Sequence, residues 1–371
     1  MQRFFLLASL TLAICVASRP VRAQQADARD FELGYFVPNN TVAFNVYARR
    51  ESATVGNDLS TNAAIMRATH VLKFGNWAMT PIDFLLPMAE ATAYRPIAAG
   101  SPAKAAIHAS GLGDVTWIPT IGYGWLQNPK IHSHTWLAAT GYVTLPSGTY
   151  DPEQALNIGR NRWMVRPQIT VGQRFARAVT LEAFANVAFA GTNSEYRLPA
   201  QVIQGAVAAT PGAATNPAIA AGVVGALGGD KELTQGMSLG AGLLAGLDLS
   251  PSMFLSASYY FAQNAKQEVK GVTFWSPQLE DQHIHTLRVG LGLRVQDFTQ
   301  VLLQFNQDLK VDNEAPITRG FFVRITHVLV RAAPKPSPSP APREEAPAPR
   351  EEAPAKEAAE DRDSEEESED L

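Results

Sequence analysis

The chain has 371 residues, a formal net charge of −4 and a single cysteine. These values argue against a disulfide framework, and they give no basic surface for nucleic acid, so we expect no nucleic-acid partner. The charge is uneven, because residues 341–371 carry four basic and thirteen acidic groups, whereas residues 24–340 carry 24 basic and 22 acidic groups.

The N-terminus has the pattern of a secretory signal. Arg3 precedes an apolar run from Phe4 to Ala17, and Ala23 offers a small residue at a cleavage point. We therefore expect residues 1–23 to be a signal peptide that directs export. Cys15 would leave with it, so the mature chain would have no thiol chemistry. After residue 23 there is no stretch of 18 apolar residues, so the sequence predicts no transmembrane helix.

The body alternates apolar and polar residues with period two, which is typical of strands with one apolar face. Leu287, Val289 and Leu291, for example, alternate with Arg288 and Gly290. The pattern predicts twelve strands: 41–51, 62–74, 77–88, 112–125, 133–145, 161–174, 179–190, 235–249, 252–265, 283–296, 298–311 and 320–330.

The connections between these strands alternate in length. Segments 75–76, 250–251 and 296–297 are tight turns, whereas 89–111 and 191–234 are long. Outer-membrane barrels have short periplasmic turns and long outer loops. We therefore expect an all-β fold, a transmembrane antiparallel barrel over residues 24–331, in the outer membrane of a Gram-negative type of cell and in contact with its lipid.

The segment 191–234 is predicted to be a long extracellular loop. Its middle is apolar, with Val207, Ile219, Val223 and Val224 among Ala and Gly. Loops of this length are usually functional or disordered, and disorder normally comes with high polarity. We expect the loop either to fold inward and constrict the lumen or to cover its mouth as a lid.

Residues 332–371 are rich in Pro, Ala and Glu and contain almost no large apolar side chain. Such a composition predicts a disordered tail. Because it follows the last strand of an even-numbered barrel, the tail should lie in the periplasm. Its carboxylates could bind divalent cations or a periplasmic partner, or it could serve as a solvated spacer.

Four segments carry a family resemblance. They are Gly111-Leu112-Gly113-Asp114, Leu145-Pro146-Ser147-Gly148-Thr149-Tyr150-Asp151, Ala155-Leu156-Asn157-Ile158-Gly159-Arg160-Asn161-Arg162-Trp163 and Gln307-Asp308-Leu309-Lys310-Val311. Over residues 29–330 the chain resembles the transporter-like family of the putative MetA pathway of phenol degradation. The resemblance implies an outer-membrane protein, sometimes encoded beside aromatic catabolism, and it brings no established catalytic residues.

If the apolar face meets lipid, the polar face lines a lumen. The basic candidates are Arg49, Arg67, Arg162, Arg166, Arg288, Arg294, Lys310 and Arg324, and the acidic ones are Asp83, Asp114, Glu182, Asp248 and Asp308. Two interpretations remain open. The groups form an arginine–carboxylate ladder that stiffens the wall, or a surplus of cations favours anionic solutes.

Motifs with other chemistry are weaker. Gly236-Met237-Ser238-Leu239-Gly240 matches a nucleophile elbow, but the period-two pattern runs straight through it. The pairs His132/His134 and His283/His285 fall at opposite ends of the predicted barrel, whereas zinc asks for three or four ligands. Ser133 and His134 would point to opposite faces. We therefore expect no metal, cofactor or catalytic site.

These observations predict a channel or transporter for small molecules, aromatic or anionic ones among them. It would work by passive or facilitated diffusion and would not be an enzyme. The alternatives are a phospholipase-like rim hydrolase, or a structural or adaptor barrel that acts through its tail.

Overall fold

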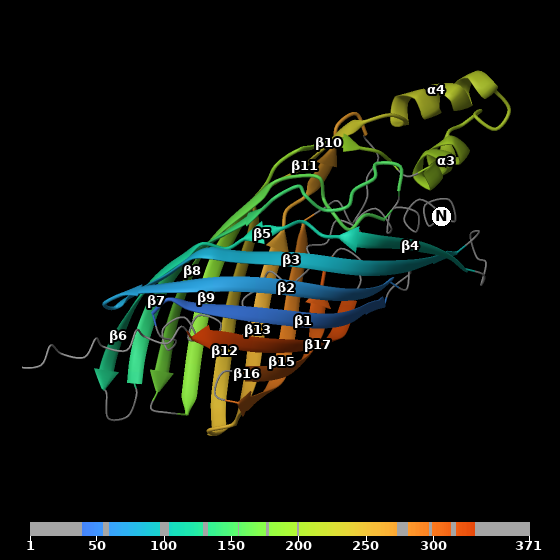
Figure 1. Ribbon diagram of the computed structural model, residues 1–371. Coiled ribbons are helices and arrows are strands. Elements are labelled where there is room, and N and C mark those ends of the chain that lie inside the picture. The colour runs from blue at the N-terminus through green and yellow to red at the C-terminus, as the bar shows by residue number, and fades with distance from the viewer. Residues whose placement is uncertain are drawn as a thin grey trace, which may run out of the picture. The chain divides into compact units, whose positions relative to one another are not determined.

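A computed structural model describes residues 39–54, 59–96, 104–128, 133–154, 156–175, 178–198, 200–272, 281–296, 299–312 and 317–330. The predicted signal peptide, Cys15, His132 and the predicted tail lie outside these residues. One sheet contains the strands of the barrel wall (Figure 1), and their bounds are β1 (Thr41–Thr54), β2 (Leu59–Phe74), β3 (Trp77–Pro96), β4 (Lys104–Leu112), β5 (Thr116–Trp117), β6 (Thr120–Asn128), β7 (Ser133–Thr144), β8 (Met164–Phe175), β9 (Val179–Ala190), β12 (Ser238–Ser250), β13 (Met253–Asn264), β15 (Gln282–Gln296), β16 (Thr299–Val311) and β17 (Ile317–Val330).

The sheet closes on itself. Each wall strand pairs antiparallel with its neighbours, and β1 pairs with β17 over fourteen residue pairs, from Thr41↔Val330 to Thr54↔Ile317. The short strands β4, β5 and β6 share one position between β3 and β7, so the fourteen strands of this sheet occupy twelve positions. The predicted twelve-stranded antiparallel barrel is therefore confirmed.

The fourth strand is interrupted, which the alternation did not predict. It was expected as one strand over 112–125. Within the described residues β4 pairs with β3 alone, whereas β5 and β6 pair with both β3 and β7. Gly111 has φ +152°, and the N–H of Gly113 donates to the carbonyl of Pro87 at 2.8 Å. The chain bends here, and this leaves an edge of β4 for another segment to cover.

The two faces of the wall differ in the expected way. Large apolar side chains such as Leu243, Ile169 and Phe321 are exposed on the outward face. The inward face carries buried polar groups and some buried rings. Glycines make room for the rings, because a Cβ on Gly292 would lie 2.0 Å from the ring of Phe254 on the adjacent strand.

Beyond the wall, the segment 191–234 forms its own elements. These are β10 (Asn193–Tyr196), α3 (Ala200–Ala209), α4 (Pro217–Leu227) and β11 (Lys231–Gln235), and β11 also pairs with β14 (Gln267–Val269). Leu198 is buried against Tyr196, Ile203, Leu227 and Val272.

The helices do not fill the lumen. No side chain of α4 is buried, and Ile219 and Val224 are 38% and 48% exposed. In Figure 1 both helices lie beyond the strand ends. The expectation that this segment folds inward as a constriction is therefore wrong. The sequence correctly predicted that this segment is ordered. It did not show on which side of the strand ends the segment lies, because alanine and glycine suit an exposed helix hairpin as well as a plug.

None of the described helices has the length and hydropathy that crossing a membrane requires.

Candidate functional site in the lumen

The predicted lumen residues on strands lie on the inward face, with one exception. Cross-strand pairs connect these positions around the wall, for example Arg49↔Phe322 and Arg324↔Leu302. The buried members are Arg49, Asp83, Glu182, Arg288, Asp308 and Arg324, and the half-buried ones are Arg67, Arg166, Asp248 and Arg294. Asp114 and Arg162 are also buried but lie in segments next to strands.

Lys310 is the exception, and its predicted place in the lumen is wrong. A β-bulge shifts the register of β15 and β16 between His285 and Thr286, so Lys310 pairs with the outward-facing His285. The Lys310 side chain is 66% exposed and lies 3.2 Å from Asp312. An inserted residue reverses every later side chain of a strand, and the alternation alone does not reveal the insertion.

Several inward arginines are held by carboxylates. Arg67 makes a bidentate pair with Asp83, at 2.8 and 2.7 Å. Arg49 pairs with Glu51. These contacts agree with the ladder interpretation, since a buried charge needs a partner and planar guanidinium suits carboxylate.

A second ion cluster lies near the short-turn end. Asp248 accepts from Arg174 of β8 at 2.7 Å and from Arg294 of β15 at 2.9 Å. Asp248 is on β12, which β9 separates from β8 and β13 separates from β15. The carboxylate thus connects strands that are not neighbours. Arg174 was missed in the sequence, although it has the same parity as Arg166 on its strand.

Two other arginines lie over aromatic rings. The Arg166 guanidinium is 4.2 Å from the ring centroid of Tyr142, and that of Arg288 is 4.3 Å from the ring of Tyr260. A cation over an aromatic face is attracted by the ring quadrupole. Sequence analysis did not place either tyrosine in the lumen, although the alternation along each strand points both side chains inward.

Apolar side chains gather in the same lumen. Tyr47, Ile65, Leu85, Ile118, Tyr142 and Phe322 form one buried cluster. Tyr142 belongs both to this cluster and to the stack with Arg166. The inner wall thus offers apolar, aromatic and cationic surface side by side.

The segment 145–163 covers the interrupted fourth strand. The carboxylate of Asp114 accepts from the N–H of Gly148 and from that of Arg160, both at 2.9 Å. The N–H of Thr149 donates to the carbonyl of Leu112 at 2.7 Å. These contacts bring together three of the segments that carry the family resemblance.

This segment lies on the inner side of the wall. Leu156 is buried against Ala91, Ala93 and Ala109, which face inward on β3 and β4. Glycines permit the close approach, because a Cβ on Gly148 would lie 2.8 Å from Asp114 and from Gly159. We call residues 145–163 the inner loop.

Basic groups of the inner loop are desolvated. Burial and the neighbouring Arg162 lower the pKa of Arg160 to about 9. Arg162 donates to the side-chain oxygen of Gln235 at 2.7 Å. Burial also raises the pKa of the Tyr150 phenol. The mouth next to Asp114 is therefore a place of low polarity that still holds positive groups.

The residues considered for other chemistry have different neighbours. Ser133 donates to the carbonyl of Arg174 at 3.1 Å, and His134 stacks on Trp136. Ser238 accepts from the N–H of Ala265. His285 contacts the hydroxyl of Tyr259 at 2.5 Å. Among the residues that the structure describes, no group of three or more His, Cys, Asp or Glu could hold a metal ion.

A family model described as "Putative MetA-pathway of phenol degradation" matches residues 46–276. The chain belongs to this family. No curated protein matches it in sequence.

One solved structure shares the fold. The COG4313 outer membrane channel from Pseudomonas putida F1 is 19% identical, with a TM-score of 0.63, and the match covers 82% of this chain and all of that one. The β domain of the Bordetella autotransporter BrkA is 10% identical over 79% of this chain and all of that one, with a TM-score of 0.42. At 19% identity the likeness to the Pseudomonas channel is one of fold.

Proposed function

We propose that this family member is an outer-membrane channel through which small aromatic or anionic molecules pass by diffusion, without chemical conversion. The end of the barrel with the long loops faces the cell exterior, and residues 332–371 lie in the periplasm. The observation that carries the proposal is the pairing of arginine with tyrosine inside a closed barrel, Arg166 over Tyr142 and Arg288 over Tyr260.

This chemistry matches one class of solute. An aromatic carboxylate or phenolate combines a flat apolar ring with a negative charge. A guanidinium can bind the oxygen atoms of such an anion, and a tyrosine beside it can stack on the ring. The inward positions named above hold eight arginines (49, 67, 162, 166, 174, 288, 294 and 324) against six carboxylates (51, 83, 114, 182, 248 and 308). The excess of positive charge supports anion preference.

The test is ion selectivity and solute uptake by purified barrel in lipid bilayers and liposomes. We expect wild-type protein to pass benzoate faster than benzylamine, which has a similar size and the opposite charge. Arg166→Gln with Arg288→Gln should lower that ratio and shift the reversal potential toward cations. Lys270→Gln is the control, because Lys270 is exposed and pairs with Glu232 outside the wall.

The outcomes distinguish the alternatives. A folded barrel with no solute-dependent flux would contradict the channel and favour an adaptor that acts through its tail. An unchanged reversal potential in the double variant would assign Arg166 and Arg288 to stiffening the wall. Heat-modifiable migration on gels checks that each variant has folded.

A further inference from the structure

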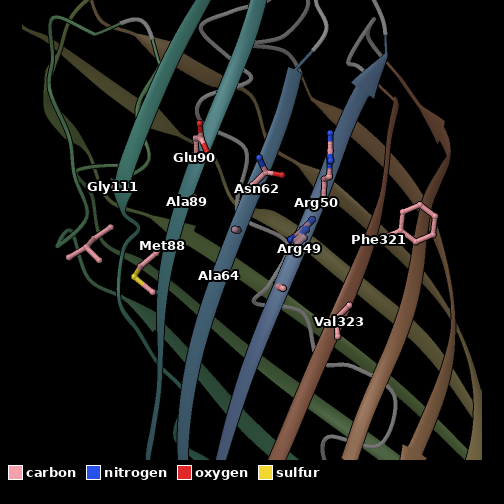
Figure 2. Close-up of a pocket in the computed structure, with 13 residues that line it drawn as sticks. Arg49, Arg50, Asn62, Ala64, Met88, Ala89, Glu90, Gly111, Phe321 and Val323 are labelled. Carbon is pink, nitrogen blue, oxygen red and sulfur yellow. The ribbon is translucent and has the colours of Figure 1, made fainter.

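The outward face of the barrel has a groove where small side chains replace large ones. Ala48 on β1 lies directly opposite Ala64 on β2. The walls are Phe321 and Val323 on one side and Met88 and Leu112 on the other, and Figure 2 shows Ala64 between Met88 and Val323. The hollow has a volume of about 780 Å³. We call it the alanine groove.

One end of the alanine groove is polar. This end is lined by Arg50, Asn62 and Glu90. Each lies on the same strand and face as Ala48, Ala64 or Met88, two residues closer to the long loops. Arg50 lies opposite Asn62, and Asn62 lies opposite Glu90. A polar row above an apolar hollow has the pattern of a site for an amphiphile whose headgroup lies at the membrane surface.

A second arginine adjoins this row. Arg50 is opposite Phe321, and Ser52 is opposite Arg319, so Arg50 and Arg319 are diagonal neighbours on one face. Such neighbours lie about 7–8 Å apart in antiparallel sheets. Both side chains are exposed, and neither forms an ion pair within the part of the chain that the structure describes. Two adjacent guanidinium groups repel each other unless an anion lies between them.

We propose that the alanine groove, with Arg50 and Arg319, binds a phosphorylated, acylated glycolipid of the outer leaflet. An acyl chain fills the hollow over Ala48 and Ala64. A phosphate binds between the two guanidinium groups, for which bidentate contacts are the preferred geometry. Asn62 and Glu90 bind sugar hydroxyls. The inference rests on the proposed function's orientation, in which the end with the long loops faces the cell exterior.

A flexible chain suits the hollow better than a second barrel does. Phe321 is 68% exposed and Leu112 is 45% exposed, so both stand above the alanine floor. A convex barrel wall would contact these two rims and leave the floor empty. An acyl chain can bend to follow the floor and fill the space between the two rims.

The test measures lipid bound to the delipidated full-length barrel by native mass spectrometry. The probes are bisphosphorylated lipid A, its dephosphorylated form and phosphatidylglycerol. We expect lipid A to bind at least about tenfold more tightly than either other probe. Arg50→Gln with Arg319→Gln should remove that preference, since each charge-assisted contact contributes about a factor of ten or more. Lys270→Gln, directly after β14 and outside the wall, is the matched control and should change nothing.

A second pair of variants tests the hollow. Ala48→Leu with Ala64→Leu fills it and should lower lipid A affinity several-fold. Ala241→Leu with Ala245→Leu, on the outward face of β12, adds the same volume elsewhere and should have no effect.

Equal binding by the wild type and the arginine variant would overturn the phosphate site, and equal binding after filling the hollow would overturn the acyl site. Equal affinity for phosphatidylglycerol would replace the glycolipid by any anionic lipid and so contradict the proposal. A stable dimer that Ala48→Leu abolishes would assign the groove to a second copy of the chain, and this result would also contradict the proposal. Conductance is measured separately, so a failed channel assay does not affect this result.

Discussion

The carboxylate of Asp114 accepts a 2.9 Å hydrogen bond from the backbone N–H of Arg160, 46 residues later in the chain. Its other oxygen accepts from the N–H of Gly148. One buried side chain therefore holds both ends of the inner loop against the place where the fourth strand is interrupted.

Replacing Asp114 should release the inner loop. Asp114→Ala leaves the N–H groups of Gly148 and Arg160 without their acceptor, at a cost of about 1–3 kcal/mol for each group that stays buried. We expect a lower unfolding temperature and a larger, noisier single-channel conductance than in the wild type. Asp312→Ala, at a half-buried carboxylate that pairs with the outward-facing Lys310, is the control. A variant with wild-type conductance would show that the inner loop does not limit flux.

Glycine on the inward face should be needed where a ring lies over it. Gly292→Ala places a methyl group 2.0 Å from the fully buried ring of Phe254. Overpacking of this kind costs about 1–3 kcal/mol. The free energy of unfolding in urea should fall accordingly. Gly222→Ala in α4, where a new Cβ meets nothing within 4 Å, should not lower it, and equal losses in both variants would contradict the packing explanation.

The helix hairpin should be dispensable for conductance. Replacing residues 200–228 with a short Gly/Ser linker removes α3 and α4, whose side chains do not fill the lumen. We expect the conductance of the shortened barrel to stay within the spread of the wild type. A marked rise would show that these helices obstruct the pore in the membrane.

The proposed orientation can be tested on intact cells. A tag inserted near Ala208 in α3 should be labelled by an impermeant reagent, because it lies at the long-loop end. A tag near Pro251, in the tight turn between β12 and β13, should be labelled only after the outer membrane is opened. The reverse pattern would place the long loops in the periplasm.

The strands of the wall could be predicted well because the alternation of apolar and polar residues depends only on near neighbours in the sequence. Alternation along Leu287, Val289 and Leu291 reflects a strand between lipid and lumen, and β15 was expected over 283–296 and observed over Gln282–Gln296. The alternation fails where the backbone departs from regular pairing. The bulge before Thr286 turns Lys310 outward, and the bend at Gly111 interrupts the fourth strand.

The candidate site was harder to predict because its contacts are long-range. Asp114, Gly148 and Arg160 were each visible in the sequence as parts of a resemblance, but nothing in their spacing shows that they meet. The stacks of Arg166 on Tyr142 and of Arg288 on Tyr260 depend on the register between strands. Parity places all four side chains inside, and only the pairing brings each arginine to its ring.

The seam between β1 and β17 has a consequence for biogenesis. Its first pair joins Thr41 to Val330, residues separated by 289 positions, whereas most other wall strands pair with their neighbours in the sequence. Pairings so distant in the chain form slowly, because loop closure precedes any gain from contacts. The cylinder therefore cannot close until synthesis and export have delivered residue 330. Until then both edge strands expose unpaired backbone groups, which makes the unfinished sheet dependent on chaperones and assembly factors that keep other chains away from its edges.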